Sequence, residues 1–397
     1  MPLRKPLLSF ILLTPLSAQP SLPPKPAYPY NIKQLHCGHS LTAPLFTPWP
    51  GQYCHLVAQM NNLPAWQVRD VMVGDATIPG AWLRFHWDTT LMWCGQNPPP
   101  CYGHGLRPRA DINLWQLLIV TENYEGPVNL NAHQSREHLL NFVQNSWQYG
   151  NGGNGTPTLL WTNWAGIDGS PYYFGGSYGI PAAIDGSASG WRRLMDSLEV
   201  GWQRMQDYAN ANRPAGCPPV YIIPGNRVMV RLYDDIQQGR VPGITHIRQL
   251  FTDGVHANDT CAYLVTLVHY ACIFNANPTG LSNQLQPGIT IPPALASYFQ
   301  QMVWQVVTSY ARSGLSHLAS SLASPVSESI EVFPNPTTEW IWVRSLHGVT
   351  ATSPLRILDM QGRLLREATQ YPIYVGDLPR GTYIAELRGA KLKWIKE

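Results

Sequence analysis

The strongest constraint on the fold of this chain is the alternation of two kinds of segment. Short apolar runs, each closed by Gly, Asn, Thr or Pro, have the length and composition of buried strands. They cover residues Ile32–Cys37, Val68–Val73, Trp115–Thr121, Thr158–Thr162 and Val220–Ile223. Segments with helical character lie between or after them, the clearest being Trp191–Asn210, Asp259–Asn275 and Pro292–Ala311. Strands separated by helices predict a parallel sheet with helices on both faces, which is a three-layer α/β/α domain.

The two ends of the chain differ in composition from this domain. Arg4 and Lys5 precede a short apolar run and a small-residue cleavage site, so residues 1–19 are predicted to be a signal peptide. The apolar run is far shorter than the roughly 20 residues that span a membrane, so we expect no stable membrane insertion, the alternative being an uncleaved anchor. The remaining boundaries place a Pro-rich leader at 20–30, the α/β domain at 31–317, a linker at 318–329 and a β-rich module at 330–397.

Charge and cysteine content narrow the classes of partner and of site. The net charge is +3 without a clustered basic stripe, so nucleic acid is not an expected partner. An exported chain can carry disulfides, and Cys94 and Cys101 bracket a short Pro-rich loop, so they are the predicted pair. Cys261 and Cys272 lie eleven residues apart in one predicted helix, about 16 Å along its axis, and cannot bond to each other. No Cys/His spacing is typical of a zinc site.

Three polar residues in this order fit the requirements of a serine hydrolase. Ser40 comes directly after the first predicted strand, and Gly38 permits a tight turn there. Asp253 and His256 come late, immediately before the apolar helix that starts at an Asp or Thr cap, and the spacing of three residues lets both face one edge of the sheet. Reactive groups in parallel α/β folds gather at the carboxyl ends of the strands. Taken singly, the Ser is better explained as an ordinary turn residue, and the Asp-x-x-His pair is explained equally well in that way.

Together, Gly38-His39-Ser40-Leu41 and Asp253-x-x-His256 resemble the first and last motif blocks of the SGNH/GDSL hydrolase superfamily. The resemblance spans roughly residues 31–285 and implies a flavodoxin-like three-layer sheet. Its middle blocks have counterparts at Thr77–Gly80 and Thr121–Tyr124, which implies oxyanion donors at Gly80 and Asn123, with Gly74 and Glu122 as rivals. The chain departs from the family pattern where His39 stands in place of the usual Asp or Asn, and Thr121 and Tyr124 in place of Gly and Asp.

The roles implied by this resemblance define a mechanism. His256 removes the proton from Ser40, Ser40 attacks an ester carbonyl, and Asp253 orients the imidazole. The N–H groups of Ser40 and Gly80 and the amide of Asn123 stabilise the oxyanion. The reaction requires no metal or organic cofactor.

Surface loops and aromatic side chains bear on the substrate. The stretches Tyr149–Gly155 and Trp164–Gly190 are predicted to be surface loops near the catalytic edge of the sheet. Six tryptophans lie in or near such loops and are interpreted either as platforms for sugar rings or as packing anchors: Trp82, Trp87, Trp93, Trp161, Trp164 and Trp191.

The last block predicts a small antiparallel sandwich. Its expected strands are Ile330–Phe333, Trp340–Ser345, Leu355–Asp359, Tyr371–Val375 and Tyr383–Arg388. The segments Phe333–Thr337, Ile357–Arg363 and Leu378–Tyr383, with the Lys391–Lys396 tail, resemble the C-terminal sorting domain of type IX (Por) secretion. This resemblance implies that the secretion machinery is a partner and that the chain is secreted or displayed at the cell surface.

These expectations combine into a secreted serine esterase that hydrolyses short-chain acyl esters such as acetate, on a glycan or another extracellular ester. Two alternatives stay open: a lipase or general carboxylesterase, and a catalytically silent SGNH-like domain that binds glycans or mediates adhesion.

Overall fold

A five-stranded parallel sheet forms the centre of the main domain. The computed structural model describes residues 22–88, 106–123, 127, 130–167, 188–318, 330–345, 355–360, 363–368, 372–387 and 390–397. The strands are β1 (Gln34–Gly38), β2 (Val73–Thr77), β3 (Leu117–Val120), β4 (Thr158–Trp161) and β5 (Tyr221–Ile223), in the order β2-β1-β3-β4-β5. This is the doubly wound order of flavodoxin-like folds. Every residue of the five strands is buried, as a parallel sheet covered on both faces requires. The predicted α/β class is therefore confirmed.

The second strand lies later in the chain than its predicted position. The prediction of a strand at Val68–Val73 was wrong, because most of that segment belongs to helix α2 (Ala65–Val71) and the strand begins at Val73. The true strand contains Gly74 and Asp75, which are poor strand formers. Tertiary contacts override that preference: the indole of Trp115 occupies the space beside Gly74, and Arg69 pairs with the buried Asp75 at 2.7 Å.

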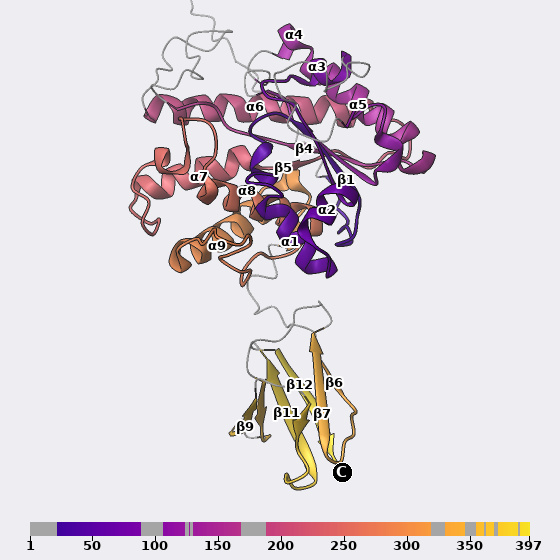
Figure 1. Ribbon diagram of the computed structural model, residues 1–397, viewed down its shortest axis with the longest axis vertical. Helices are drawn as coiled ribbons and strands as arrows, with labels where there is room; N and C mark the ends of the chain where they lie inside the picture. The colour runs from indigo at the N-terminus through magenta and orange to yellow at the C-terminus, as the bar shows by residue number, and fades with distance from the viewer. Residues whose placement is uncertain are drawn as a thin grey trace, which may run out of the picture.

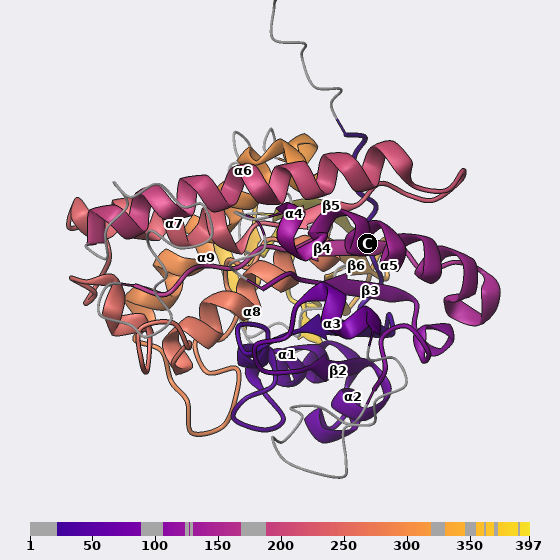
Figure 2. The same ribbon diagram turned by 90° about the horizontal axis from the view of Figure 1, so that it is seen from above.

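Helices cover both faces of this sheet (Figure 1). Above it in that view lie α3 (Leu83–Asp88), α4 (Leu130–His133), α5 (Ser135–Tyr149) and α6 (Ala188–Asn212). Below it lie α1 (Gln52–Asn61), α2, α7 (Gly225–Gln237), α8 (Asp259–Phe274) and α9 (Pro293–Ser309). Figure 2 shows α6 crossing the domain as its longest helix. The predicted helices at 191–210, 259–275 and 292–311 correspond to α6, α8 and α9.

The central helix α8 is buried along almost its whole length, which explains its continuous apolar sequence. Its cap is neither the Asp nor the Thr expected from the sequence. The side chain of Asn258 accepts hydrogen bonds from the N–H groups of Thr260 and Cys261 at 3.1 and 3.2 Å. Because an N-cap satisfies otherwise unpaired helix donors, Asn258 fixes the point where the chain leaves the preceding loop and enters the core.

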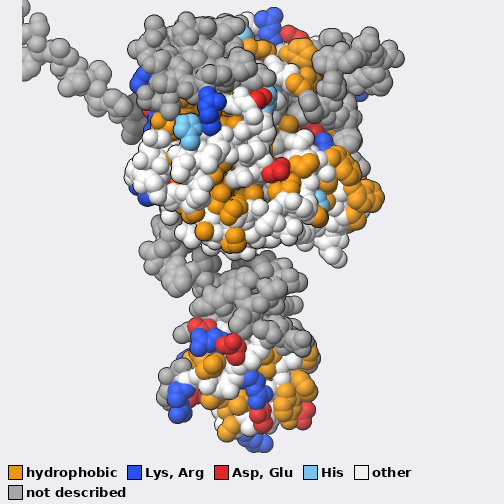
Figure 3. All heavy atoms as spheres, turned by 60° about the vertical axis from the view of Figure 1, so that its left-hand side comes forward, with side chains coloured by type: hydrophobic (Ala, Val, Ile, Leu, Met, Phe, Trp, Pro, Cys, Tyr) orange, Lys and Arg blue, Asp and Glu red, His pale blue; other side chains and the backbone are white. Residues whose placement is uncertain are grey.

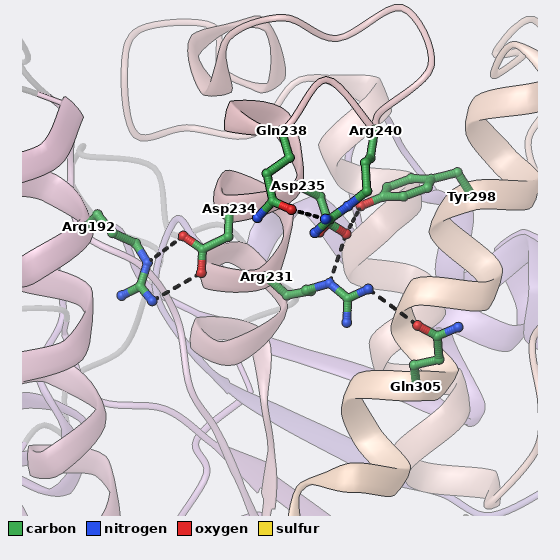
Figure 4. Close-up of polar contacts among 8 residues, drawn as sticks. All are labelled: Arg192, Arg231, Asp234, Asp235, Gln238, Arg240, Tyr298 and Gln305. Atoms are coloured by element: carbon green, nitrogen blue, oxygen red, sulfur yellow. Dashed lines mark hydrogen bonds and ion pairs between the residues drawn. The ribbon is translucent and has the colours of Figure 1, made fainter.

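A group of charged side chains fastens α6, α7 and α9 together (Figure 4). Arg192 on α6 donates two hydrogen bonds to Asp234 on α7, at 2.9 and 3.1 Å. Asp235 accepts from Arg231 at 2.8 Å, from Tyr298 on α9 at 2.5 Å and from Arg240. Burial acts to raise the pKa of Asp235, but these donors hold it below its usual value. The Asp235 carboxylate therefore stays ionised and links α7 to α9 through Tyr298.

Residues 22–30, which belong to the Pro-rich leader, are extended and bonded to the main domain. Lys25 donates its backbone N–H to Gly314 at 2.9 Å, and Asn275 donates to the Lys25 carbonyl at 2.7 Å. The Lys25 ammonium is buried against the ring of Tyr28, and burial lowers its pKa to about 7. The leader thus contributes to the packed structure of the α/β domain.

The stretch Tyr149–Gly155 does not lie where the sequence led us to expect. It follows α5 and includes a short 3-10 helix (Asn151–Gly153) that precedes β4. This position is at the amino end of β4, the edge of the sheet opposite the predicted catalytic edge. Thr156 anchors it by donating to the carbonyl of Trp115, just before β3, at 2.6 Å. The correction leaves Trp164–Gly190 as the predicted loop at the catalytic edge, and residues 168–187 of it lie outside the described residues.

The C-terminal module consists of two antiparallel sheets. One contains β6 (Ile330–Phe333), β7 (Trp340–Ser345) and β10 (Ile373–Tyr374), and the other β8 (Leu355–Leu358), β9 (Leu364–Ala368), β11 (Gly381–Leu387) and β12 (Ala390–Lys396). Side chains from both sheets, among them Ile341, Ile357 and Trp394, share one apolar core. The strands β9 and β12 were not predicted. β9 buries none of its side chains fully, and the sequence of β12 had been interpreted as a basic tail.

The two parts differ in surface character and are alike in lacking a membrane-spanning helix among the described residues. On the face drawn in Figure 3, small hydrophobic groups alternate with polar surface on the α/β domain, whereas charged side chains of both signs gather on the C-terminal module. None of the described helices is both long enough and apolar enough to cross a bilayer. Among the described residues, five cysteines are buried and form no disulfide: Cys37, Cys54, Cys217, Cys261 and Cys272. The predicted Cys94–Cys101 pair and the signal peptide lie outside the described residues.

Candidate functional site

The carboxyl ends of four parallel strands bring the predicted site residues to one edge of the sheet. Ser40 follows β1, Gly80 follows β2, Asn123 follows β3 and Asn163 follows β4. This edge is where ligands bind in open α/β folds.

A tight turn presents Ser40 at this edge. The turn is closed by a hydrogen bond from the Thr42 N–H to the His39 carbonyl at 2.8 Å. A side chain at Gly38 would lie 2.2 Å from the Thr42 hydroxyl and 2.8 Å from a Thr121 methyl group, so only glycine fits there. Two donors then hold the Gly38 carbonyl: the Ile78 N–H at 2.8 Å and the His86 imidazole at 2.9 Å. The sequence prediction of a glycine-dependent turn before Ser40 is confirmed.

A separate loop between β5 and α8 carries Asp253 and His256. It is closed on itself by a bond from the Thr252 N–H to the His256 carbonyl at 2.8 Å. The segment after β4 supports it, because the Trp164 indole donates to the Val255 carbonyl at 2.8 Å and the Ile167 N–H donates to Gly254 at 2.9 Å. The orientation of this loop therefore depends on a fully buried tryptophan rather than on solvent-exposed contacts.

The three predicted catalytic side chains meet in a continuous chain of hydrogen bonds. The Ser40 hydroxyl lies 3.0 Å from His256 Nε2, and His256 Nδ1 lies 2.6 Å from Asp253 Oδ2. The other carboxylate oxygen of Asp253 accepts the N–H groups of His256 and Val255 at 2.9 and 3.2 Å. Burial acts to raise the pKa of Asp253, but these hydrogen bonds hold it below its usual value. An ionised Asp253 keeps the proton on Nδ1, which leaves Nε2 as the acceptor that faces Ser40.

The two predicted oxyanion residues also lie side by side. The Asn123 amide donates to the Gly80 carbonyl at 3.1 Å. A carboxamide carries a second N–H, which is the donor that the predicted role requires. In the described part of the chain we find no acceptor bonded to the backbone N–H of Ser40 or of Gly80. The rival Gly74 lies inside β2 with the Trp115 indole beside it, so it is away from the strand end.

A buried polar layer beneath Ser40 contains residues that sequence analysis missed or left open. Asn163 donates to the Thr121 hydroxyl at 2.9 Å and to the Glu122 carbonyl at 3.0 Å. His39 donates to the same carbonyl at 3.1 Å, and burial lowers its pKa to about 4, so its ring is neutral at pH 7. His39, which stands where the SGNH/GDSL pattern usually has Asp or Asn, is thus part of this polar layer. An Asn directly after the predicted strand at 158–162 was the available signal for Asn163.

The six tryptophans divide between the two interpretations. Trp161, Trp164 and Trp191 are fully buried and act as packing anchors. Trp87 is partly buried against Phe142, and Trp93 lies outside the described residues. Trp82, two residues after Gly80, is half-buried and stacks on His133 with ring centroids 3.6 Å apart. Trp49, at a loop beyond Ser40, is 59% exposed and had not been singled out.

No cluster of three or more His, Cys, Asp or Glu side chains in the described part of the chain is placed to hold a metal ion. The described polar residues of the site are held by one another and by backbone groups.

Comparison with known proteins identifies the C-terminal module. Residues 331–397 match the secretion system C-terminal sorting domain. The chain is therefore exported by type IX secretion to the cell surface or the medium, and this module is the part that the secretion machinery recognises. The predictions of the sorting domain and of export are confirmed.

No curated protein matches the chain significantly. Among solved structures, a DUF4886 family protein from Bacteroides uniformis ATCC 8492 resembles it with a TM-score of 0.47 and 16% sequence identity, over 70% of this chain and 94% of that one. Nothing about function follows from that similarity.

Proposed function

We propose that the α/β domain is a serine hydrolase that cleaves short-chain acyl esters outside the cell. The observation that carries this proposal is the unbroken contact from Ser40 through His256 to Asp253, with distances of 3.0 and 2.6 Å. A nucleophile, a base and a group that orients the base are the parts that such catalysis needs. The SGNH/GDSL resemblance of the segments around these residues assigns them the same roles.

The reaction proceeds in two halves. His256 Nε2 takes the Ser40 proton while Ser40 Oγ forms a bond to the ester carbonyl carbon, and the negative charge moves to the carbonyl oxygen. The C–O bond to the alcohol then breaks, and His256 returns the proton to the leaving alcohol. Water, deprotonated by His256, attacks the acyl-enzyme and releases the acid and free Ser40. Asp253 stabilises the imidazolium in both halves.

Three groups would donate to the oxyanion in this proposal. They are the N–H groups of Ser40 and Gly80, which have no acceptor in the described part of the chain, and the side-chain amide of Asn123, which lies beside Gly80. They come from the ends of β1, β2 and β3, so the rigid sheet sets their spacing. Loss of one such donor typically lowers the rate by about 100- to 1000-fold.

We take the ester to carry a short acyl group. This choice is supported by the polar groups of His39, Glu122 and Asn163 that are buried next to Ser40, because such groups would not favour contact with a long alkyl chain. Trp82 near Gly80 is the aromatic surface that a sugar ring of an acylated glycan could contact.

The test is hydrolysis of p-nitrophenyl acetate, butyrate and octanoate by the full chain and by Ser40→Ala. Ser316→Ala is the matched control, because Ser316 is an exposed serine of the same domain. We expect activity that falls with acyl length, is abolished in Ser40→Ala and is unchanged in Ser316→Ala. A fluorophosphonate probe should label the wild type and the control only.

Three results would reject parts of the proposal. Activity that persists in Ser40→Ala would remove Ser40 as the nucleophile. A folded wild type that neither turns over these esters nor reacts with the probe would favour the alternative of a non-catalytic binding domain. A preference for octanoate would replace the acetylesterase by a lipase.

A further inference from the structure

The Glu122 carboxyl group lies buried between the two loops that carry the proposed oxyanion donors. Its Oε1 accepts the N–H of Leu83 at 3.0 Å and the N–H of Asn123 at 2.7 Å. Leu83 lies three residues after Gly80, and the Asn123 amide donates to the Gly80 carbonyl at 3.1 Å. The loop after β2 and the end of β3 are therefore joined twice, once through Glu122 and once through Asn123.

The same helix that begins at Leu83 is also attached to the nucleophile turn. His86, one turn further along α3, donates to the Gly38 carbonyl at 2.9 Å, two residues before Ser40. The backbone carbonyl of Glu122 accepts from His39 at 3.1 Å, next to Ser40. Glu122 thus contacts both walls of the site, through its side chain on the Gly80 side and through its backbone on the Ser40 side.

The environment of this carboxyl group is costly for a charge. Glu122 is fully buried, and no Lys, Arg or His of the described chain lies within ion-pair distance of its carboxylate. Burial raises its pKa to about 7 against the opposing effect of its N–H donors and of Ser135 on α5. The titratable groups that adjoin it are Cys37 on β1 and His39, and burial keeps both neutral at pH 7. A buried carboxyl group without a cation does not favour stability, so its value lies in what it holds in place.

We propose that Glu122 is a positioning residue: it fixes the loop from Gly80 to Leu83 and the Asn123 side chain at the spacing from Ser40 that the oxyanion requires. The inference rests on the proposed function, since only an oxyanion site gives this spacing a purpose. What matters in this role is an acceptor oxygen at the reach of a glutamate side chain. The negative charge itself is not needed.

Two variants separate the effect of the length of the Glu122 side chain from the effect of its charge. Glu122→Gln keeps an acceptor oxygen at the same reach and loses the charge, and its NH₂ group can donate to the Ser135 hydroxyl. Glu122→Asp keeps the charge and is one methylene shorter, so it cannot reach both N–H groups. The matched controls are Glu199→Gln and Glu199→Asp, because Glu199 is a buried carboxyl group on α6 held by Asn226 and Tyr310 at 2.8 and 2.5 Å.

The readouts are kcat and KM for p-nitrophenyl acetate, together with amide hydrogen exchange of the peptides that contain Leu83 and Asn123. We expect Glu122→Gln to stay within about threefold of the wild-type kcat. Glu122→Asp should lose about 10- to 100-fold in kcat with KM changed less than threefold, and exchange at both peptides should rise. Both Glu199 variants should keep the wild-type kcat and exchange at these peptides.

Three outcomes would overturn the proposal. Glu122→Asp could keep full activity while Glu122→Gln loses it, which would mean that charge is what matters. The Glu199 variants could lose as much kcat as Glu122→Asp, which would indicate general destabilisation. The exchange rates could be the same in Glu122→Asp and in the wild type. Hydrogen exchange does not depend on turnover, so an inactive wild type would reject the esterase proposal while the exchange data still decide whether Glu122 holds these loops.

Discussion

Mild acid should destabilise the α/β domain strongly, because four histidines are buried in it as neutral rings. Burial lowers the pKa of His39, His86 and His269 to about 4, and that of His36 well below its usual value. The ordinary histidine pKa is about 6.5, so between pH 6.5 and 4 the unfolded chain binds protons that the folded chain does not. Stability is therefore fully present above pH 6.5 and is lost as the pH falls.

The size of the effect follows from proton linkage. The slope for each histidine approaches its full value of about 1.4 kcal/mol per pH unit only below pH 6.5, so the three histidines whose folded pKa is about 4 together remove about 5 kcal/mol between pH 6.5 and 5, and His36 adds to this loss. Glu122 acts in the opposite direction. Its folded pKa of about 7 lies above the value of 4.5 for an ordinary glutamate, so the folded chain gains a proton first and recovers about 2 kcal/mol over the same interval. The net loss of about 3 kcal/mol, to which His36 adds, is a large part of the stability of many domains.

The assay is urea unfolding at pH 7.5, 6.5, 5.5 and 5, followed by tryptophan fluorescence, since twelve of the fifteen tryptophans precede residue 318. The unfolding midpoint should fall steeply below pH 6.5. His269→Phe should flatten the pH dependence by about one proton, whereas His317→Gln, at an exposed position, should leave it unchanged. A midpoint that is constant or rises from pH 7.5 to 5 would refute the reasoning.

Three further changes give distinct outcomes. Asp253→Asn should lower kcat for p-nitrophenyl acetate by about 1000- to 10,000-fold with little change in KM, because His256 loses the partner that sets its tautomer. An unaffected kcat would exclude Asp253 from the site. Gly225→Ala should lower the free energy of unfolding in urea by about 2 kcal/mol or more, because the new methyl group would lie 2.1 Å from the Trp161 ring. An unchanged unfolding midpoint would contradict this packing. The folded pKa of Lys25, about 7, lies below the ordinary 10.5, so between pH 7 and 8.5 only the unfolded chain keeps this proton, and the wild type gains up to about 2 kcal/mol of stability as the pH rises. Lys25→Met should lack this gain. Identical pH profiles of the two proteins would disprove the burial of this ammonium.

The parts of the fold set by local pattern could be predicted, and those set by tertiary contact could not. The position of Ser40 at the carboxyl edge of the sheet could be predicted because Ser40 directly follows the first strand of a parallel sheet. The segment around Val68 looked like a strand because it is apolar, whereas the real β2 contains Gly74 and Asp75, which only the contacts of Trp115 and Arg69 make suitable.

The same division holds within the site. The position of Asn163 after a predicted strand and of Glu122 beside Asn123 could be read from the sequence, but their roles could not, since these depend on which strand ends become neighbours. The order of strands in the sheet decides this, and the alternation of strands and helices does not reveal that order.

Ser40 and His256 lie 216 residues apart in the chain, yet the Ser40 hydroxyl is 3.0 Å from His256 Nε2 in the fold. Ser40 follows the first strand, whereas His256 lies in the loop directly before α8, which Trp164 supports. A chain that is still unfolded on its way out of the cell has no means of bringing the two together. The proposed hydrolase would therefore not hydrolyse esters inside the cell that makes it. Its activity would begin only when the exported chain completes its fold.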